Sequence, residues 1–233
     1  MSIKVLVACE FSGTVRDAFN AYDAFDAWSC DLRADDNRSN RHIQGDVRDI
    51  LGEGWDLLVV AHPPCTRLCN SGVRWLSEPP GKLGGDYSAA DRAAYAGMSR
   101  EQRLDFMWSG LRFGADLFST LWNAPVPHIA VENPVMHKHA KAIIRNYVEP
   151  AQSVQPWQYG HGETKRTCFW LRNLPPLTPT NVVDGREARV HNMAPVPERS
   201  KERSRFFTGI AAAMADQWGH HVLAQVQGLR RAA

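Results

Sequence analysis

One short segment, Asp56-Leu-Leu-Val-Val-Ala-His-Pro-Pro-Cys65, constrains the fold of this chain more than any other. An apolar run of this length that ends in chain breakers predicts a buried β-strand. Pro63 and Pro64 cannot continue a hydrogen-bonded ladder, so the chain must leave the sheet there. Cys65 is therefore expected at the carboxyl end of a strand, where open α/β sheets bind their ligands. Its thiol is either a nucleophile or a buried structural cysteine, and this segment alone does not decide between the two.

The other apolar segments predict a doubly wound, mostly parallel, Rossmann-like α/β sheet with helices on both faces. Strands that alternate with helical segments favour parallel pairing. Thr14 is expected to cap the first helix. The expected strands are residues 3–9, 24–30, 43–46, 56–61, 128–132, 154–158 and 167–171, and the expected helices are residues 15–22, 100–123, 138–147 and 206–226.

Two long segments show no helical or strand periodicity. Residues 68–99 are rich in Gly, Pro, Ser and Ala, and a stretch of this length inside a compact domain is usually functional or disordered. Residues 172–205 hold many prolines and are too few to build a core of their own. We therefore expect residues 1–233 to form a single domain that contains two irregular segments.

The composition narrows the classes of partner and compartment. Lys and Arg number 27 against 25 for Asp and Glu, a net charge of +2, so contact with nucleic acid would have to come from a local patch. Such patches occur at residues 165–172 and 199–205. The five cysteines are an odd number in a chain too large to need disulfides, which favours reduced thiols in a cytoplasmic protein. No apolar run is long enough for a secretion signal or a membrane span, so we expect no membrane association.

Two reactive groups, Cys65 and Glu132, follow neighbouring strands of the predicted sheet. Because parallel strands end at one edge, the thiol and the carboxyl are expected to face one pocket, and such a pair suits covalent catalysis with acid assistance. The turn Phe11-Ser-Gly13 follows the first strand, and Asp31 and Asp46 follow the next two. This pattern fits a nucleoside-containing cofactor whose ribose binds an acidic group, although a glycine in such a turn also has a structural use.

A metal site is a competing use for these thiols. Cys65, Cys69 and His62 have the right residue types, but no second Cys or His pair at zinc spacing follows them. We therefore predict no metal centre. Cys69 is the other possible nucleophile, although it lacks the position at the end of a strand.

Taken in order, these segments resemble the motifs of the DNA cytosine-C5 methyltransferase family over most of the chain. The Pro-Pro-Cys that ends at Cys65 and the Glu132-Asn133 pair carry the specific part of the resemblance. The matching segments are residues 10–13, Asp31, and residues 45–50, 56–65, 131–133, 164–166 and 207–213. The chain looks like a compact, phage- or prophage-like member, because the short residues 172–205 stand where the family has a full target-recognition domain.

The resemblance implies S-adenosyl-L-methionine as cofactor and a flipped-out cytosine of duplex DNA as substrate. The cofactor-binding residues that it implies are Phe11, Ser12, Gly13, Thr14, Asp31, Asp46, Val47 and Pro63. The catalytic residues that it implies are Cys65, Glu132, Asn133 and Arg166, and the residues that contact the DNA or the base are Pro64, Ser71 and Lys165. In this family the loop after the nucleophile is mobile and closes over the base, which gives that role to residues 68–99.

The chemistry that the resemblance implies begins when the Cys65 thiolate adds to C6 of the cytosine, so that C5 can accept a methyl group. Glu132 would protonate or polarise N3 during this attack. Arg166 would stabilise charge near the O2 carbonyl, and Asn133 would orient the loop. Extruding the base from the duplex costs a few kcal/mol.

Departures from the family pattern leave other substrates open. Of the glycine-rich turn only Gly13 remains, Cys9 stands where an aspartate is usual, Thr66 replaces a glutamine, and Cys168 replaces a second arginine. One alternative is C5 methylation of a pyrimidine nucleotide or of RNA. Another is an inactive fold that binds DNA. A protein partner that supplies target recognition is also compatible with the short residues 172–205.

Overall fold

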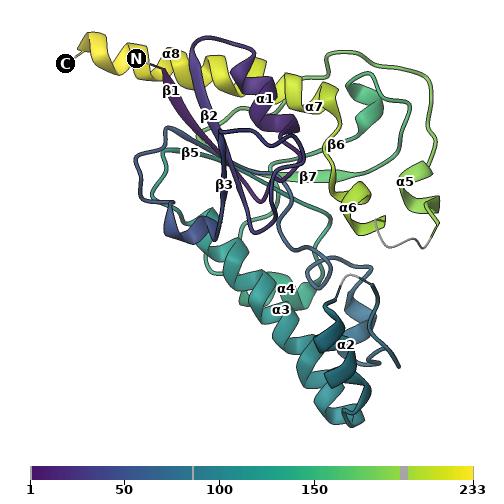
Figure 1. Cartoon of the computed structure of the whole chain (residues 1–233). Coiled ribbons are helices and arrows are strands. Elements are labelled where there is room, and N and C mark those ends of the chain that lie inside the picture. The colour runs from purple at the N-terminus through teal and green to yellow at the C-terminus, as the bar shows by residue number, and fades with distance from the viewer. Residues whose placement is uncertain (1, 86, 195–198, 233) are drawn as a thin grey trace.

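The structure, a computed structural model, describes residues 2–85, 87–194 and 199–232, and within them seven strands form one sheet (Figure 1). They are β1 (Ile3–Ala8), β2 (Phe25–Asp31), β3 (His42–Gln44), β4 (Leu57–Val60), β5 (His128–Asn133), β6 (Gln152–Val154) and β7 (Thr167–Arg172). The order is β3-β2-β1-β4-β5-β7-β6, with β1 to β5 parallel and β7 antiparallel to both neighbours. The predicted Rossmann-like sheet is confirmed, and its order reverses between β1 and β4, the switch point at which such sheets bind ligands.

Helices cover both faces of the sheet because its strands are apolar on both sides. The helices are α1 (Thr14–Asn20), α3 (Arg100–Trp122), α4 (Lys138–Ile143), α7 (Thr208–Ala213) and α8 (His220–Ala232). Leu58 of β4 belongs to the cluster under α3 and α4, whereas its neighbour Val59 belongs to the cluster under α1, α7 and α8. The two helical layers lie on opposite sides of the sheet in Figure 1.

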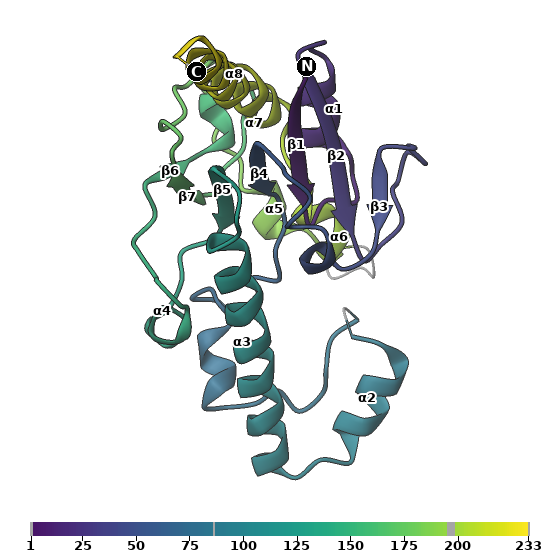
Figure 2. The same cartoon turned by 90° about the vertical axis from the view of Figure 1, so that its left-hand side faces the viewer.

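The long helix α3 carries an arm away from the sheet. Its 23 residues span about 35 Å, whereas the six-residue strand β5 spans about 20 Å, so the first half of α3 extends past the sheet edge (Figure 2). This half packs beside the 3₁₀ turn η2 (Val73–Leu76) and α2 (Ala89–Ala96). We call residues 66–85 and 87–108 the arm. Periodicity predicted no helix over residues 68–99, and the structure places η2 and α2 there.

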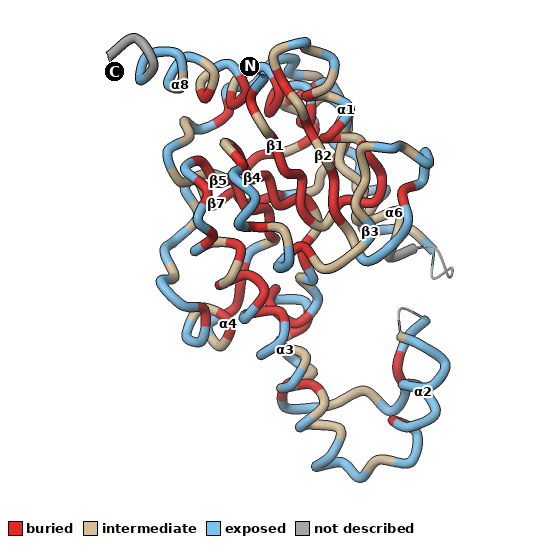
Figure 3. Tube along the Cα trace, turned by 60° about the vertical axis from the view of Figure 1, so that its left-hand side comes forward, coloured by how far each residue is buried: buried red, intermediate tan, exposed pale blue. Residues whose placement is uncertain are grey.

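Aromatic side chains hold the arm together. Tyr95 of α2 is fully buried, packs edge-on against Phe106 at 5.4 Å and donates its hydroxyl to the carbonyl of Pro80 at 2.8 Å. The Trp108 indole donates to the carbonyl of Leu76 at 3.1 Å. Figure 3 shows the outer part of the arm as mostly intermediate or exposed, with a few buried positions. These contacts join residues that are not near neighbours in the sequence. The periodicity of apolar residues within one segment therefore does not predict them.

Some predicted boundaries are wrong. The sequence predicts a strand over residues 154–158, but Pro156 lacks the N–H of a ladder residue, so β6 ends at Val154 and a 3₁₀ turn, η3 (Pro156–Gln158), follows. The single helix predicted over residues 206–226 is two helices joined by a π-helical segment, η4 (Met214–Gly219). The helix predicted to reach residue 147 ends at residue 143.

Short helices occur in the proline-rich segment as well. Residues 172–205, which are predicted as irregular, include α5 (Arg189–Asn192) and α6 (Arg199–Ser204). In the described part of the chain, no helix combines the length and the apolar character that crossing a membrane requires.

Candidate active site

The structure brings Cys65 and Glu132 together at the carboxyl edge of the sheet. Cys65 follows β4 after Pro63 and Pro64, and Glu132 is near the end of β5, which pairs in parallel with β4. The carboxyl of Glu132 acts on the thiol of Cys65, whose pKa it helps to raise. Pro63 is buried and Pro64 is exposed, so the chain turns outward between them.

Glu132 is suited to hold a proton at neutral pH. Its side chain is only 8% exposed, and burial raises the pKa of the carboxyl to about 7. The ammonium of Lys165 opposes this shift, and the Cys69 thiolate adds to it. A carboxyl that changes protonation near pH 7 has the properties of a general acid.

The pairing of β5 with β7 decides which cation faces this carboxyl. Glu132 is opposite Phe169, and Asn133 is opposite Cys168. Since side chains alternate along an extended chain, Lys165 shares the face of Phe169 and Glu132. Lys165 also acts electrostatically on both Glu132 and Cys65. The residue that resemblance implies for the catalytic cation, Arg166, is instead on the face of Asn133.

Arg166 lies in a different environment. Its side chain is exposed and donates a hydrogen bond to the thiol of Cys168. The lining of a small cavity of about 150 Å³ includes Arg166, Cys168, Lys141, Tyr147 and Trp170. This cavity is on the α3 and α4 side of the sheet, to which Cys168 and Trp170 belong.

Asn133 is fully buried, and neither atom of its side-chain amide has a hydrogen-bond partner among the described residues. An unpaired buried amide costs about 1–3 kcal/mol, so such groups are kept where something else binds them. A ligand, a water molecule or a rearranged loop would satisfy this amide.

The loop after Cys65 is a compact turn that holds a second thiol. The N–H groups of Leu68 and Cys69 both donate to the carbonyl of Cys65, at 2.9 and 3.1 Å. The Cys69 sulfur is 3.0 Å from the Ser71 hydroxyl and hydrogen-bonds with the Cys65 thiol. This shared hydrogen bond raises the pKa of Cys65 and lowers that of Cys69. Ser71, which the resemblance implies as a base-binding residue, is exposed and lies beside Cys69.

The turn after β1 is organised by a buried acid that sequence reasoning did not single out. The carboxylate of Glu10 accepts hydrogen bonds from the N–H groups of Val15 at 2.7 Å and Arg16 at 3.1 Å. Burial raises the pKa of Glu10 to about 7. The prediction that Thr14 caps α1 is wrong, because Gly13 is the N-cap, at φ +72°, and Glu10 already occupies the helix amides. Ser12 lies between Glu10 and Gly13 in the sequence, and its hydroxyl shares a hydrogen bond with that of Thr14 at 3.1 Å.

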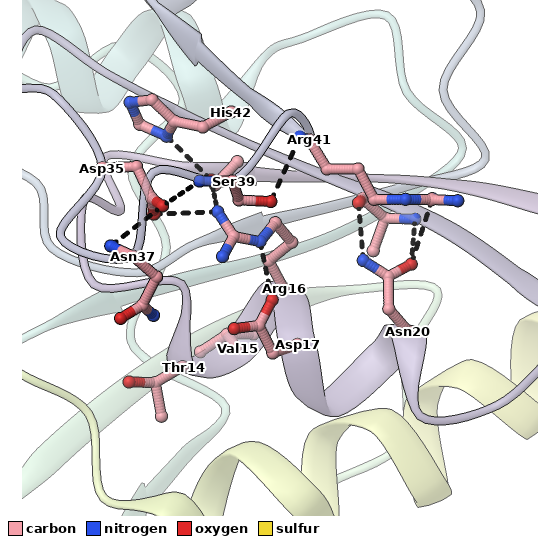
Figure 4. Close-up of polar contacts among 12 residues, drawn as sticks. Thr14, Val15, Arg16, Asp17, Asn20, Asp35, Asn37, Ser39, Arg41 and His42 are labelled. Atoms are coloured by element: carbon pink, nitrogen blue, oxygen red, sulfur yellow. Dashed lines mark hydrogen bonds and ion pairs between the residues drawn. The ribbon is translucent and has the colours of Figure 1, made fainter.

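The guanidinium of Arg16 lies against the turn at Gly13. Its side chain is 1% exposed and donates to Ser29 and Asp35, each at 2.9 Å, and to Asp17 at 2.8 Å (Figure 4 shows the last two). A Cβ on Gly13 would come within 2.2 Å of the guanidinium, so this turn needs a glycine there.

The two predicted acidic cofactor residues differ in availability. Asp31 ends β2 with a partly exposed carboxylate that accepts the N–H of Arg33 at 2.9 Å, and burial raises its pKa. Asp46 caps η1 (Val47–Asp49) and pairs with the guanidinium of Arg48. Val47 is buried in the core. Asp31 is therefore the more available of the two carboxylates.

A basic segment, residues 201–207, crosses this edge and is called the strap. Lys201 and Arg205 each donate to a different oxygen of Asp36 at 2.6 Å, and both cations lie over the ring of Phe11. Phe206 packs on the ring of His62 at 5.0 Å. Phe11, implied as a cofactor residue, is consequently only 4% exposed.

Comparisons with known proteins give distant similarities. The chain matches no model of a protein family and no curated protein. Among solved structures it is similar to a methyltransferase of Entamoeba histolytica, at 13% identity and a TM-score of 0.43, over 78% of this chain and 58% of that one. It is also similar to a proposed DNA modification methyltransferase encoded within a prophage (E. coli), at 16% identity and a TM-score of 0.42, over 78% and 52%. The chain spans little more than half of either structure.

Proposed function

We propose that this protein transfers a methyl group from S-adenosyl-L-methionine to C5 of cytosine in DNA, through a covalent bond between Cys65 and C6. One observation carries the proposal: a thiol presented by a strand end and two prolines faces a buried carboxyl whose pKa is about 7. Burying an ionisable carboxyl next to a thiol is costly, and such arrangements concentrate at sites of chemistry.

The residues can be assigned to balanced steps. The Cys65 sulfur bonds to C6 while the Glu132 carboxyl gives its proton to N3, which leaves an electron-rich C5. When bound, S-adenosyl-L-methionine supplies the methyl group that C5 takes. Loss of the C5 proton to a base expels the Cys65 sulfur, and Glu132 recovers the proton of N3.

Asn133 supports this assignment through its unsatisfied amide. The residue follows Glu132 directly and is fully buried without a side-chain partner among the described residues. An amide has both a donor and an acceptor, which match the backbone of a loop that closes on the site. The cost of leaving it unpaired would be recovered when substrate binds.

The switch point fits the nucleoside part of the cofactor. Asp31, at the end of β2, offers a partly exposed carboxylate to ribose hydroxyls, and Phe11, in the turn after β1, offers an aromatic ring. The N-terminus of α1 does not fit the cofactor's carboxylate, because Glu10 already accepts its N–H groups. We therefore assign the nucleoside to Asp31 and Phe11 and leave the helix terminus out of the site.

Cofactor entry requires the strap to move. Lys201 and Arg205 cover Phe11 and are fixed to Asp36 by two ion pairs. Both cations belong to the strap and to the basic patch at residues 199–205 that the sequence predicts for nucleic-acid contact. The phosphates of DNA therefore compete with Asp36 for the same cations. DNA binding and cofactor access are thereby linked through Asp36.

The arm is the part of the chain best placed to contact duplex DNA. It begins directly after Cys65 and projects past the sheet edge (Figures 2 and 3). Arg92, Arg100 and Arg103 donate to backbone carbonyls of the arm, which fixes guanidinium groups on its surface. We infer that the arm takes the place of the missing target-recognition domain.

Transfer of tritiated methyl groups tests the function. Wild-type protein and Cys65→Ala are incubated with labelled S-adenosyl-L-methionine and unmethylated duplex DNA, with dCMP, or with tRNA. Label in the DNA cytosine with the wild type, and none with the variant, supports the proposal. Label only in dCMP or only in tRNA would show that this molecule, and not DNA, is the substrate. No label in any of the three would contradict methyl transfer and favour a protein that only binds DNA.

A further inference from the structure

Lys165 stands out among the groups that surround the Cys65 sulfur. The hydrogen bond with Cys69, burial, the carboxylate of Glu132 and the charge of Cys69 all raise the pKa of the Cys65 thiol, and the ammonium of Lys165 lowers it. A nucleophilic cysteine has to reach its thiolate form. Of these five influences, the charge of Lys165 is the one that favours that form.

The structure holds this ammonium in place. Its Nζ donates to the backbone carbonyls of Arg203 at 2.7 Å and Arg205 at 3.4 Å, both next to or within α6. Burial and the charge of Arg203 lower the pKa of Lys165, and Glu132 and Cys65 oppose this shift without cancelling it. The two carbonyls fix the direction of the ammonium, and the two potential anions favour its charged form.

We propose that Lys165, and not Arg166, is the cation that stabilises the Cys65 thiolate and the charge on Glu132 during the reaction. Lys165 keeps its own proton throughout, and the proton that Cys65 loses passes to solvent. Arg166, which precedes β7, does not take this role, because it donates to Cys168, the partner of Asn133 in the sheet and not of Glu132. The inference depends on the proposed function only for what Cys65 attacks.

Alkylation of Cys65 by iodoacetamide reports on its thiolate without any substrate. Trypsin cuts after Arg67, so Cys65 and Cys69 fall on separate peptides and each modification rate can be followed by mass spectrometry from pH 6 to 10. The proteins to compare are the wild type, Lys165→Gln, Lys165→Arg and Arg166→Gln, each checked by circular dichroism for a native fold. Arg166→Gln is the matched control, because it removes a neighbouring cation from the other face.

The expected result is a roughly tenfold slower alkylation of Cys65 in Lys165→Gln at each pH of this range, which corresponds to a thiol pKa about one pH unit higher. Lys165→Arg restores most of the rate, and Arg166→Gln stays within about twofold of the wild type. Equal profiles for the wild type and Lys165→Gln would overturn the proposal, as would a larger shift in Arg166→Gln.

Methyl transfer by the same proteins separates this inference from the proposed function. Loss of transfer in Lys165→Gln that recovers at high pH agrees with a role through the thiolate. If no protein transfers methyl groups but Lys165→Gln still slows alkylation, the function is wrong and the role of Lys165 stands. If the wild type transfers methyl groups and the alkylation profile of Lys165→Gln equals that of the wild type, the proposed function stands and the proposed role of Lys165 is wrong.

Discussion

Glu132 of β5 and Phe169 of β7 are direct partners in the sheet, and this pairing decides which residues share a face with the nucleophile. Because side chains alternate along an extended chain, Lys165 lies on the same face as Phe169 and Glu132, and Arg166 lies on the other face. A shift of one residue would exchange the two cations. A motif that is compared letter by letter does not contain this information, since the face depends on how β7 pairs with β5.

Replacing Glu132 should remove the decline of the methyl-transfer rate at high pH. Glu132→Gln can still donate a hydrogen bond but has no proton to give, so methyl transfer should fall by ~10²–10⁴. In the wild type the protonated carboxyl disappears as the pH rises through about 7, so the rate of the acid-assisted step declines above that pH. Single-turnover rates from pH 6 to 9 check this, and a decline that persists in the variant would belong to another group.

The same substitution should stabilise the fold at alkaline pH. Burial raises the pKa of Glu132 from 4.5 to about 7, so the folded state binds the proton more tightly and ionisation costs folding energy. The cost is absent below pH 4.5, grows between the two pKa values and is complete above about 7. Glu132→Gln should raise the free energy of unfolding at pH 8 by about 3 kcal/mol and change it little at pH 4. Urea titrations at both pH values measure it, and an equal effect at both would exclude this cause.

The nucleophile loop depends on a glycine. A Cβ at Gly72 would lie 1.9 Å from the carbonyl oxygen of Thr66, whereas a Cβ at Gly81 meets nothing within 4 Å. Gly72→Ala should therefore displace the turn that holds Cys65 and Cys69, and lower methyl transfer at least tenfold while the sheet stays folded. Gly81→Ala is the control and should behave as the wild type. Full activity in Gly72→Ala would show that the turn is not needed for the chemistry.

Loosening the strap should speed cofactor entry. Asp36→Asn weakens the two ion pairs with Lys201 and Arg205, each between partly exposed groups. Such pairs together contribute on the order of 1 kcal/mol, so S-adenosyl-L-methionine should associate roughly fivefold faster. Stopped-flow binding checks this against Asp116→Asn, which removes the exposed pair with Arg145. Equal association rates in all three proteins would mean that the strap does not gate the site.

The parts of the fold set by local chemistry could be predicted from the sequence. The apolar run before Pro63 and Pro64 predicts a buried strand, and the structure places β4 there, paired in parallel with β5. The long helix expected from residue 100 is α3, which Ser99 caps with Gln102. In each case the signal lies within a few neighbouring residues.

Features that depend on distant partners could not be predicted. The role of Glu10 appears only when its carboxylate reaches the amides of α1, and Tyr95 finds Phe106 and Pro80 only after the arm has folded. The contact of Lys165 with the strap joins residues 38 positions apart. None of these interactions leaves a period or a motif in the sequence.

The most direct test of the account uses a duplex in which cytosine carries fluorine at C5. After methyl transfer such a base has no C5 proton to lose, so the bond between Cys65 and C6 cannot break and the complex survives denaturing electrophoresis. The account predicts a stable adduct with the wild type and S-adenosyl-L-methionine, with Cys65 on the cross-linked tryptic peptide, and no adduct with Cys65→Ser. An adduct that persists in Cys65→Ser, or a wild type that methylates ordinary duplex without forming any adduct, would contradict the covalent mechanism.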